Sequence, residues 1–147
     1  MTAIKGPTKV ENMIRVLRQW QAIERQAIND TAEIMEKSDS SLIRMVMEII
    51  RHDSIMHHRV QQFLIDSVTK EAVTVSREDV AAIWEKIEAH DVIERKTIEL
   101  AKGLLAEAWS PVHKQLLDYL IKDEMKHDSL LGQLGELKQG MDASSGG

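Results

Sequence analysis

The chain has 147 residues, of which 43% are hydrophobic and 29% charged, and this balance is ordinary for one soluble globular domain. The net charge of -5 offers no basic surface to nucleic acid, and the absence of cysteine excludes disulfides, thiolate zinc sites and cysteine-ligated iron–sulfur clusters. Any bound metal must therefore have oxygen and nitrogen ligands.

The same composition predicts an all-α protein in the cytoplasm. Turn-formers and β-favouring aromatic residues are scarce, with 2 Pro, one Tyr and one Phe against 8 Met. No apolar run approaches the roughly 20 residues of a membrane span, and the N-terminus lacks the apolar core of a signal peptide. We expect no membrane and no nucleic-acid partner.

The first half of the chain reads as two helices. Apolar residues recur every three or four positions from about Thr8 to Lys37, which predicts an amphipathic helix. The polar turn 38–41 offers N-caps for a second helix that ends near Lys70. The short segment 71–76 is then expected to be the crossover connection of a four-helix bundle.

The second half repeats this organisation. Ser76 suits the N-cap of a third helix over residues 77–108, and Ser110-Pro111 suits the start of a fourth, since Ser favours the N-cap and Pro the first helical position. We expect the bundle to occupy residues 1–139 and residues 140–147 to form a disordered tail.

Chemistry-bearing residues recur in the two halves with a shift of 70 residues. Ile23-Glu24-Arg25 recurs as Ile93-Glu94-Arg95, and Asp53 with His57 recurs as Asp123 with His127. Two helix pairs related by a pseudo-two-fold axis would bring both copies to one central point, where clustered carboxylates and imidazoles suit a pair of metal ions.

These polar residues interrupt the apolar stripes of all four predicted helices at mid-length. Several buried carboxylates would not coexist without cations to neutralise them, so bound divalent metals are expected. His90 lies one turn before Glu94 and corresponds to Trp20 in the first copy. It is a candidate metal ligand, a residue that orients a ligand by a hydrogen bond, or a proton carrier. The candidate metal ligands are Glu24, Asp53, His57, Glu94, Asp123, Glu124, His127 and His90.

A known ligand pattern of helical bundles combines single glutamates with a Glu-x-x-His motif. Here it is matched by Glu24 of the first helix, Glu94 of the third and Glu124-x-x-His127 of the fourth. On these residues the chain resembles the ferritin-like di-iron carboxylate family, in particular small rubrerythrin-like bundles, over about residues 10–137. The second helix departs from the family pattern, because Ser54 stands where the first residue of Glu-x-x-His is expected before His57. Asp53 is the neighbouring carboxylate that could replace it.

The resemblance implies an all-α, ferritin-like four-helix bundle made of two pseudo-symmetric helix pairs. It also implies two divalent metal ions, with iron favoured over manganese or zinc, and oxidation of Fe(II) by dioxygen or peroxide with electrons from an external donor. Three classes stay open: an oxidoreductase of ferroxidase or peroxidase type, a non-catalytic metal-binding protein, and a bundle whose polar core serves only assembly. We expect a homodimer or larger homo-oligomer, because apolar residues such as Trp109 exceed what one bundle can bury.

Overall fold

The computed structural model describes residues 8–145, which form four α-helices. They are α1 (Lys9–Lys37), α2 (Ser41–Thr69), α3 (Arg77–Glu107) and α4 (Pro111–Ser145). The all-α prediction is confirmed, and the ends of the first three helices lie within one residue of their predicted positions. None of the described helices is apolar over a stretch long enough to cross a membrane.

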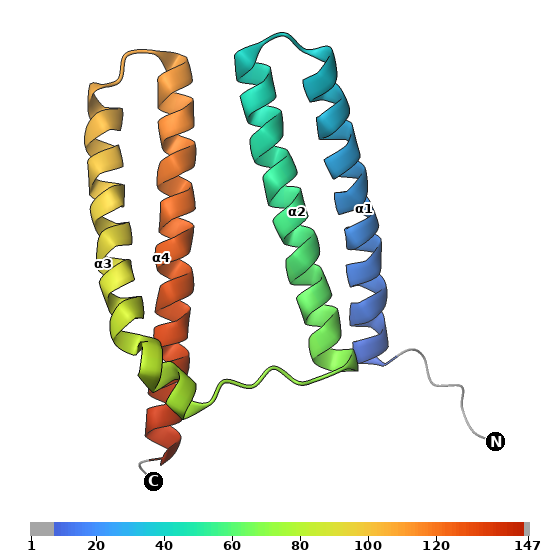
Figure 1. Cartoon of the computed structure of the whole chain (residues 1–147), viewed down its shortest axis with the longest axis vertical. Coiled ribbons are helices and arrows are strands. Elements are labelled where there is room, and N and C mark those ends of the chain that lie inside the picture. The colour runs from blue at the N-terminus through green and yellow to red at the C-terminus, as the bar shows by residue number, and fades with distance from the viewer. Residues whose placement is uncertain (1–7, 146–147) are drawn as a thin grey trace, which may run out of the picture. The chain divides into compact units, whose positions relative to one another are not determined.

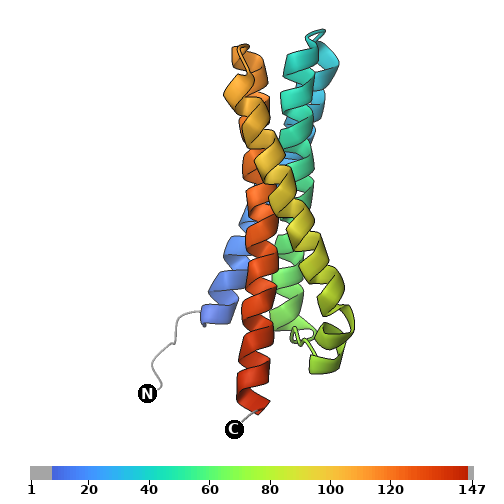
Figure 2. The ribbon, with the colours of Figure 1, turned by 90° about the vertical axis from the view of Figure 1, so that its left-hand side faces the viewer.

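The helices pack as two hairpins, α1 on α2 and α3 on α4 (Figure 1). The chain divides into two compact units between Val73 and Thr74, so that each hairpin is one unit. Within the second unit, α3 crosses α4 obliquely (Figure 2). Each hairpin therefore brings the middle of one helix against the middle of its neighbour, which is where the repeated polar residues lie.

Local capping explains where the helices begin. Thr8 accepts a hydrogen bond from the backbone N–H of Glu11, whose carboxylate accepts one from Thr8 N–H, and this capping box fixes the start of α1. Ser40 and Ser76 likewise accept backbone N–H bonds three residues ahead, and Ser110 does so directly before Pro111. The predicted Ser76 and Ser110 caps are confirmed.

The end of α4 differs from the sequence-based expectation. The helix continues to Ser145, so residues 140–145 of the expected disordered tail are helical, while residues 146 and 147 lie outside the described part of the chain. Gly140 does not adopt a positive φ and so continues the helix, at the modest cost of glycine in a helix interior. Arg77 donates a hydrogen bond of 2.9 Å to the carbonyl of Met141, which ties this last turn to the start of α3.

Each hairpin buries few apolar side chains by itself. Leu17 and Ile65 are buried in the first unit, and Ile98 and Ile121 in the second. Large apolar residues of the predicted stripes remain exposed on both hairpins, so each retains an apolar face. The exposed stripe residues include Val46, Val60 and Phe63 in the first hairpin and Ile83, Leu104, Leu120 and Leu134 in the second.

Candidate metal centre

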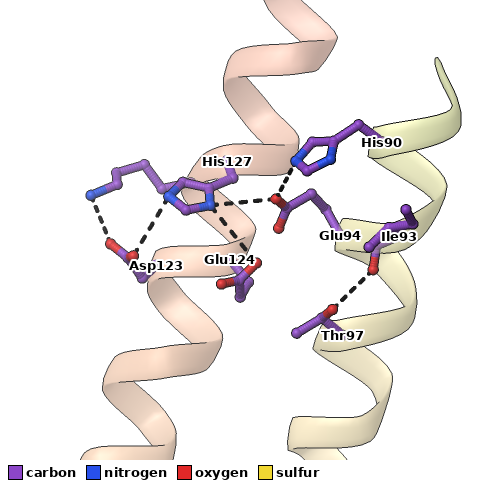
Figure 3. A network of polar contacts seen from close by, with 8 residues as sticks. His90, Ile93, Glu94, Thr97, Asp123, Glu124 and His127 are labelled. Carbon is purple, nitrogen blue, oxygen red and sulfur yellow. Dashed lines mark hydrogen bonds and ion pairs between the residues drawn. The ribbon is translucent and has the colours of Figure 1, made fainter. Parts of the chain in front are cut away.

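The second hairpin gathers three potential metal ligands. Glu94 of α3 and Glu124 and His127 of α4 each offer one ligand atom, and these atoms lie within 4.8 Å of one another (Figure 3). No other group of three such residues occurs within the part of the chain that the structure describes.

The helical register places these side chains together. Glu124 and His127 are three residues apart and so share one face of α4, and Figure 3 shows the Glu94 carboxylate reaching toward them from α3. Glu94 is only 7% exposed, whereas Glu124 and His127 are half-buried. The cluster thus has a desolvated carboxylate at its centre and a solvent-facing side.

The spacing suits a metal ion. His127 Nδ1 lies 3.6 Å from Glu94 Oε1 and 3.7 Å from Glu124 Oε2. Ligand atoms bound at about 2.1 Å in a tetrahedral site are separated by about 3.4 Å, so only a small contraction would be needed. Glu94 Oε2 is also buried and has no hydrogen-bond partner. Buried polar atoms usually have a partner, and a bound cation would supply one here.

Asp123 contacts the opposite side of the His127 ring. Its Oδ2 lies 3.5 Å from His127 Nε2, and its Oδ1 lies 2.8 Å from Lys126 Nζ. A carboxylate at one imidazole nitrogen fixes the tautomer and leaves the other nitrogen for a metal. This contact leaves His127 Nδ1, the atom that faces both glutamates, as the ring nitrogen that could bind a metal.

The first hairpin repeats part of this arrangement. His57 Nδ1 lies 3.4 Å from Glu24 Oε1, the same pair of atoms that His127 and Glu94 bring together. Glu24 is 7% exposed, like Glu94, and Ser54 is buried at the position equivalent to Glu124. The first hairpin therefore has the glutamate and the imidazole but not the second carboxylate.

The eight candidate residues thus fall into four groups. Glu94, Glu124 and His127 form the cluster, and Asp123 and His90 contact its members. Glu24 and His57 form a pair in the other unit. Asp53 is half-buried on α2 and is not part of a three-ligand group, so its role as a substitute ligand stays a prediction.

The two clustered glutamates shift each other's pKa in opposite directions. The pKa of Glu94 is lowered, chiefly by hydrogen bonding with Glu124, and His90 lowers it further. The pKa of Glu124 is raised, first by that hydrogen bond and then by burial. A carboxylate must be deprotonated to bind a cation, so the raised pKa of Glu124 means that metal affinity should rise with pH.

A second carboxylate pair lies nearby and was not anticipated from the sequence. Asp91 and Asp128 share a hydrogen bond that raises the pKa of Asp91 and lowers that of Asp128. Arg95 bridges them, at 3.1 Å from Asp91 and 3.2 Å from Asp128. The spacing of Asp91 and Arg95 by four residues was a signal in the sequence, but pairing either with Asp128 requires the register between α3 and α4.

Replacing Glu124 by glutamine should change how stability depends on pH in the metal-free protein. Because the pKa of Glu124 is raised in the folded state, this residue stabilises the fold fully at pH below its unfolded-state pKa. That stabilisation is lost as the pH rises through its folded-state pKa. Because the pKa of Glu94 is lowered in the folded state, this residue stabilises the fold fully at pH above its unfolded-state pKa. That stabilisation is lost only as the pH falls through its folded-state pKa. The pair therefore stabilises most near the ordinary glutamate pKa of 4.5 and less at neutral pH.

An amide at position 124 donates an N–H at every pH, so the melting temperature of Glu124→Gln relative to wild type should increase between about pH 4.5 and pH 8. Thermal unfolding in the presence of a chelator measures this difference. Glu136→Gln, on the exposed face of α4, is the control. A difference that stays constant across this range would contradict the raised pKa of Glu124.

Comparisons of the chain with protein-family models, with curated proteins and with solved structures found no match. Its function must therefore be inferred from the structure: two helical hairpins and, within the described residues, one cluster of two glutamates and a histidine that could hold a metal.

Proposed function

We propose that the protein binds divalent metal through Glu94, Glu124 and His127 of the second hairpin. The observation that carries this proposal is the buried, unpartnered oxygen of Glu94 beside a second carboxylate and an imidazole nitrogen at ligand spacing. Two carboxylates and one neutral imidazole balance the charge of a divalent ion, and Asp123 orients the imidazole.

We further propose that the hairpins assemble as a ferritin-like four-helix bundle. Their exposed apolar faces support this, since an isolated hairpin leaves that surface in water. In such a bundle Glu24 and His57 of the first hairpin would form a second, poorer half of the metal centre. Segment 71–76, which follows α2 and precedes α3, would be the crossover connection.

Iron is the metal we favour, with manganese or zinc as alternatives. Mixed carboxylate and imidazole ligands without sulfur suit these ions, and three protein ligands leave coordination positions open. Iron bound there would supply one-electron oxidation chemistry of the ferroxidase or peroxidase type, using an external electron donor. The protein residues would hold the ion and orient His127.

A polar core without catalysis is the second candidate. The raised pKa of Glu124 favours its neutral form, which would let it lie beside the buried Glu94 without a cation, and Ser54 leaves the first hairpin without the second carboxylate. This reading predicts a folded protein that neither contains nor needs metal.

Metal analysis distinguishes the two. We expect protein purified without added metal to contain iron or manganese, and the metal-free protein to bind one ion tightly and a second more weakly in anaerobic calorimetric titrations. At 100 times the dissociation constant a ligand that binds only the native state stabilises it by about 2.7 kcal/mol, so the melting temperature should rise on loading. Absence of binding by Fe(II), Mn(II) and Zn(II) would refute the metal centre and leave the polar core.

A further inference from the structure

The two buried glutamates each have a nitrogen-bearing ring one helical turn before them. Trp20 Nε1 donates a hydrogen bond of 3.1 Å to Glu24 Oε1, and His90 Nε2 lies 2.8 Å from Glu94 Oε1. Positions 20 and 90 are equivalent in the 70-residue repeat. The side chains differ in chemistry, but the atom that each contacts is the same oxygen of the equivalent glutamate.

This equivalence bears on the role of His90. An indole N–H donates a hydrogen bond and cannot bind a metal, so Trp20 can act on Glu24 only as a donor. His90 Nε2 already contacts Glu94 Oε1, and Oε2 of the same carboxylate is the atom without a partner. Figure 3 shows that the contacts of His90 and His127 meet at the same oxygen of Glu94, Oε1, which His90 approaches from α3 and His127 from α4.

We propose that His90 and Trp20 are positioning residues that hold Oε1 of Glu94 and of Glu24 by N–H donation and so fix the orientation of each carboxylate for metal binding. This inference rests on the proposed metal centre and assigns His90 outside the ligand set. Carboxylate ligands are commonly oriented by such donors, whose removal weakens metal affinity by roughly 10- to 100-fold.

The chain supplies the substitution that tests this role. His90→Trp exchanges the residue for the one used at the equivalent position, and it keeps a ring N–H while removing any ability to ligate. His90→Phe and His90→Ala remove the donor as well. Position 90 is exposed, so these side chains can be accommodated without rearranging a core.

A matched control lies on the same helix. Trp84 Nε1 donates a hydrogen bond of 2.6 Å to Glu88 Oε1, with the same four-residue spacing, but Glu88 is exposed and does not belong to the cluster. Trp84→Phe therefore removes an equivalent bond that should not affect metal binding.

The probe is Co(II) alone, titrated into the metal-free full-length protein and followed by calorimetry and by its visible absorption spectrum, which reports the ligand set. We expect His90→Phe and His90→Ala to bind at least about tenfold more weakly than wild type. We expect His90→Trp to restore the affinity to near the wild-type value with an unchanged spectrum. Trp84→Phe should match wild type, and circular dichroism should show equal helix content throughout.

Two results would overturn the positioning role alone. If His90→Trp binds as weakly as His90→Phe and has an altered spectrum, His90 is a ligand. If His90→Phe binds as tightly as wild type, the contact with Glu94 does not position the carboxylate. Failure of the wild-type protein to bind Co(II) would refute the metal centre itself, and the positioning role with it.

Discussion

Glu124→Ser is expected to abolish tight metal binding. The substitution gives the second hairpin the composition of the first, with one buried glutamate, one histidine and a serine between them. It removes one of three ligands and half of the negative charge that faces the ion. Removing an outer-shell partner alone costs roughly 10- to 100-fold in affinity, so we expect the loss of a direct ligand to exceed about 100-fold.

Calorimetric titration with Mn(II) measures this loss, and the metal-dependent rise in melting temperature should disappear with it. Glu136→Ser changes an exposed glutamate of the same helix and should leave both quantities unaltered. Unchanged affinity in Glu124→Ser would show that the cluster is not the metal site.

The reciprocal substitution, Ser54→Glu, is expected to create a second tight site. Ser54 is buried beside the Glu24–His57 pair, at the position that Glu124 occupies in the other hairpin. A carboxylate there completes the three-ligand set. Without metal it buries an extra acid, so we expect the free energy of unfolding to fall by roughly 1–3 kcal/mol, and metal should reverse this loss.

The measurements are metal stoichiometry and thermal unfolding with and without Mn(II). Ser54→Gln, of similar size but without the charge, is the control and should bind no additional metal. If Ser54→Glu binds no more tightly than wild type, the pseudo-symmetry of the two half-sites does not extend to metal binding. Asp53→Ala in the wild-type background tests separately whether Asp53 supplies the missing carboxylate, because only then should it weaken the second ion.

The sequence predicted the helices well because their limits are set locally. Ser76 and Ser110 cap the first turns of α3 and α4 through bonds that span three residues, and Pro111 suits only the first position. The end of α4 was not predicted, because glycine commonly ends a helix and the prediction therefore stopped before Gly140. The contact that extends the helix, from Arg77 to the Met141 carbonyl, joins residues 64 positions apart.

The site was predictable to the extent that it depends on helical faces. Glu94, Glu124 and His127 follow from periodicity and from the repeat, and the structure brings them together. Trp20 falls at the three- to four-residue spacing of the apolar residues in the first helix, yet it is half exposed and its N–H donates a hydrogen bond to Glu24. An indole ring can pack as an apolar side chain and also donate a hydrogen bond, so only the structure shows that Trp20 donates to Glu24.

The Asp91–Asp128 pair and the place of Asp123 at His127 Nε2 depend on more than helical periodicity. The first requires the register of α3 against α4, which periodicity does not give. The second requires the orientation of an imidazole ring, which is set by side-chain packing. The four-residue spacing places Asp123 and His127 on the same face of α4, but it does not predict which ring nitrogen of His127 the Asp123 carboxylate contacts.

All three clustered ligands belong to one hairpin, and this affects the order of folding. The contacts between α3 and α4 join nearby parts of the chain around a short turn, and proteins rich in such local contacts fold rapidly. Closure of this hairpin is enough to bring Glu94, Glu124 and His127 to ligand spacing, before any association with the first hairpin. If the proposed metal centre is present, metal can therefore bind as soon as this hairpin closes, and folding of the C-terminal half should be faster with metal than with a chelator.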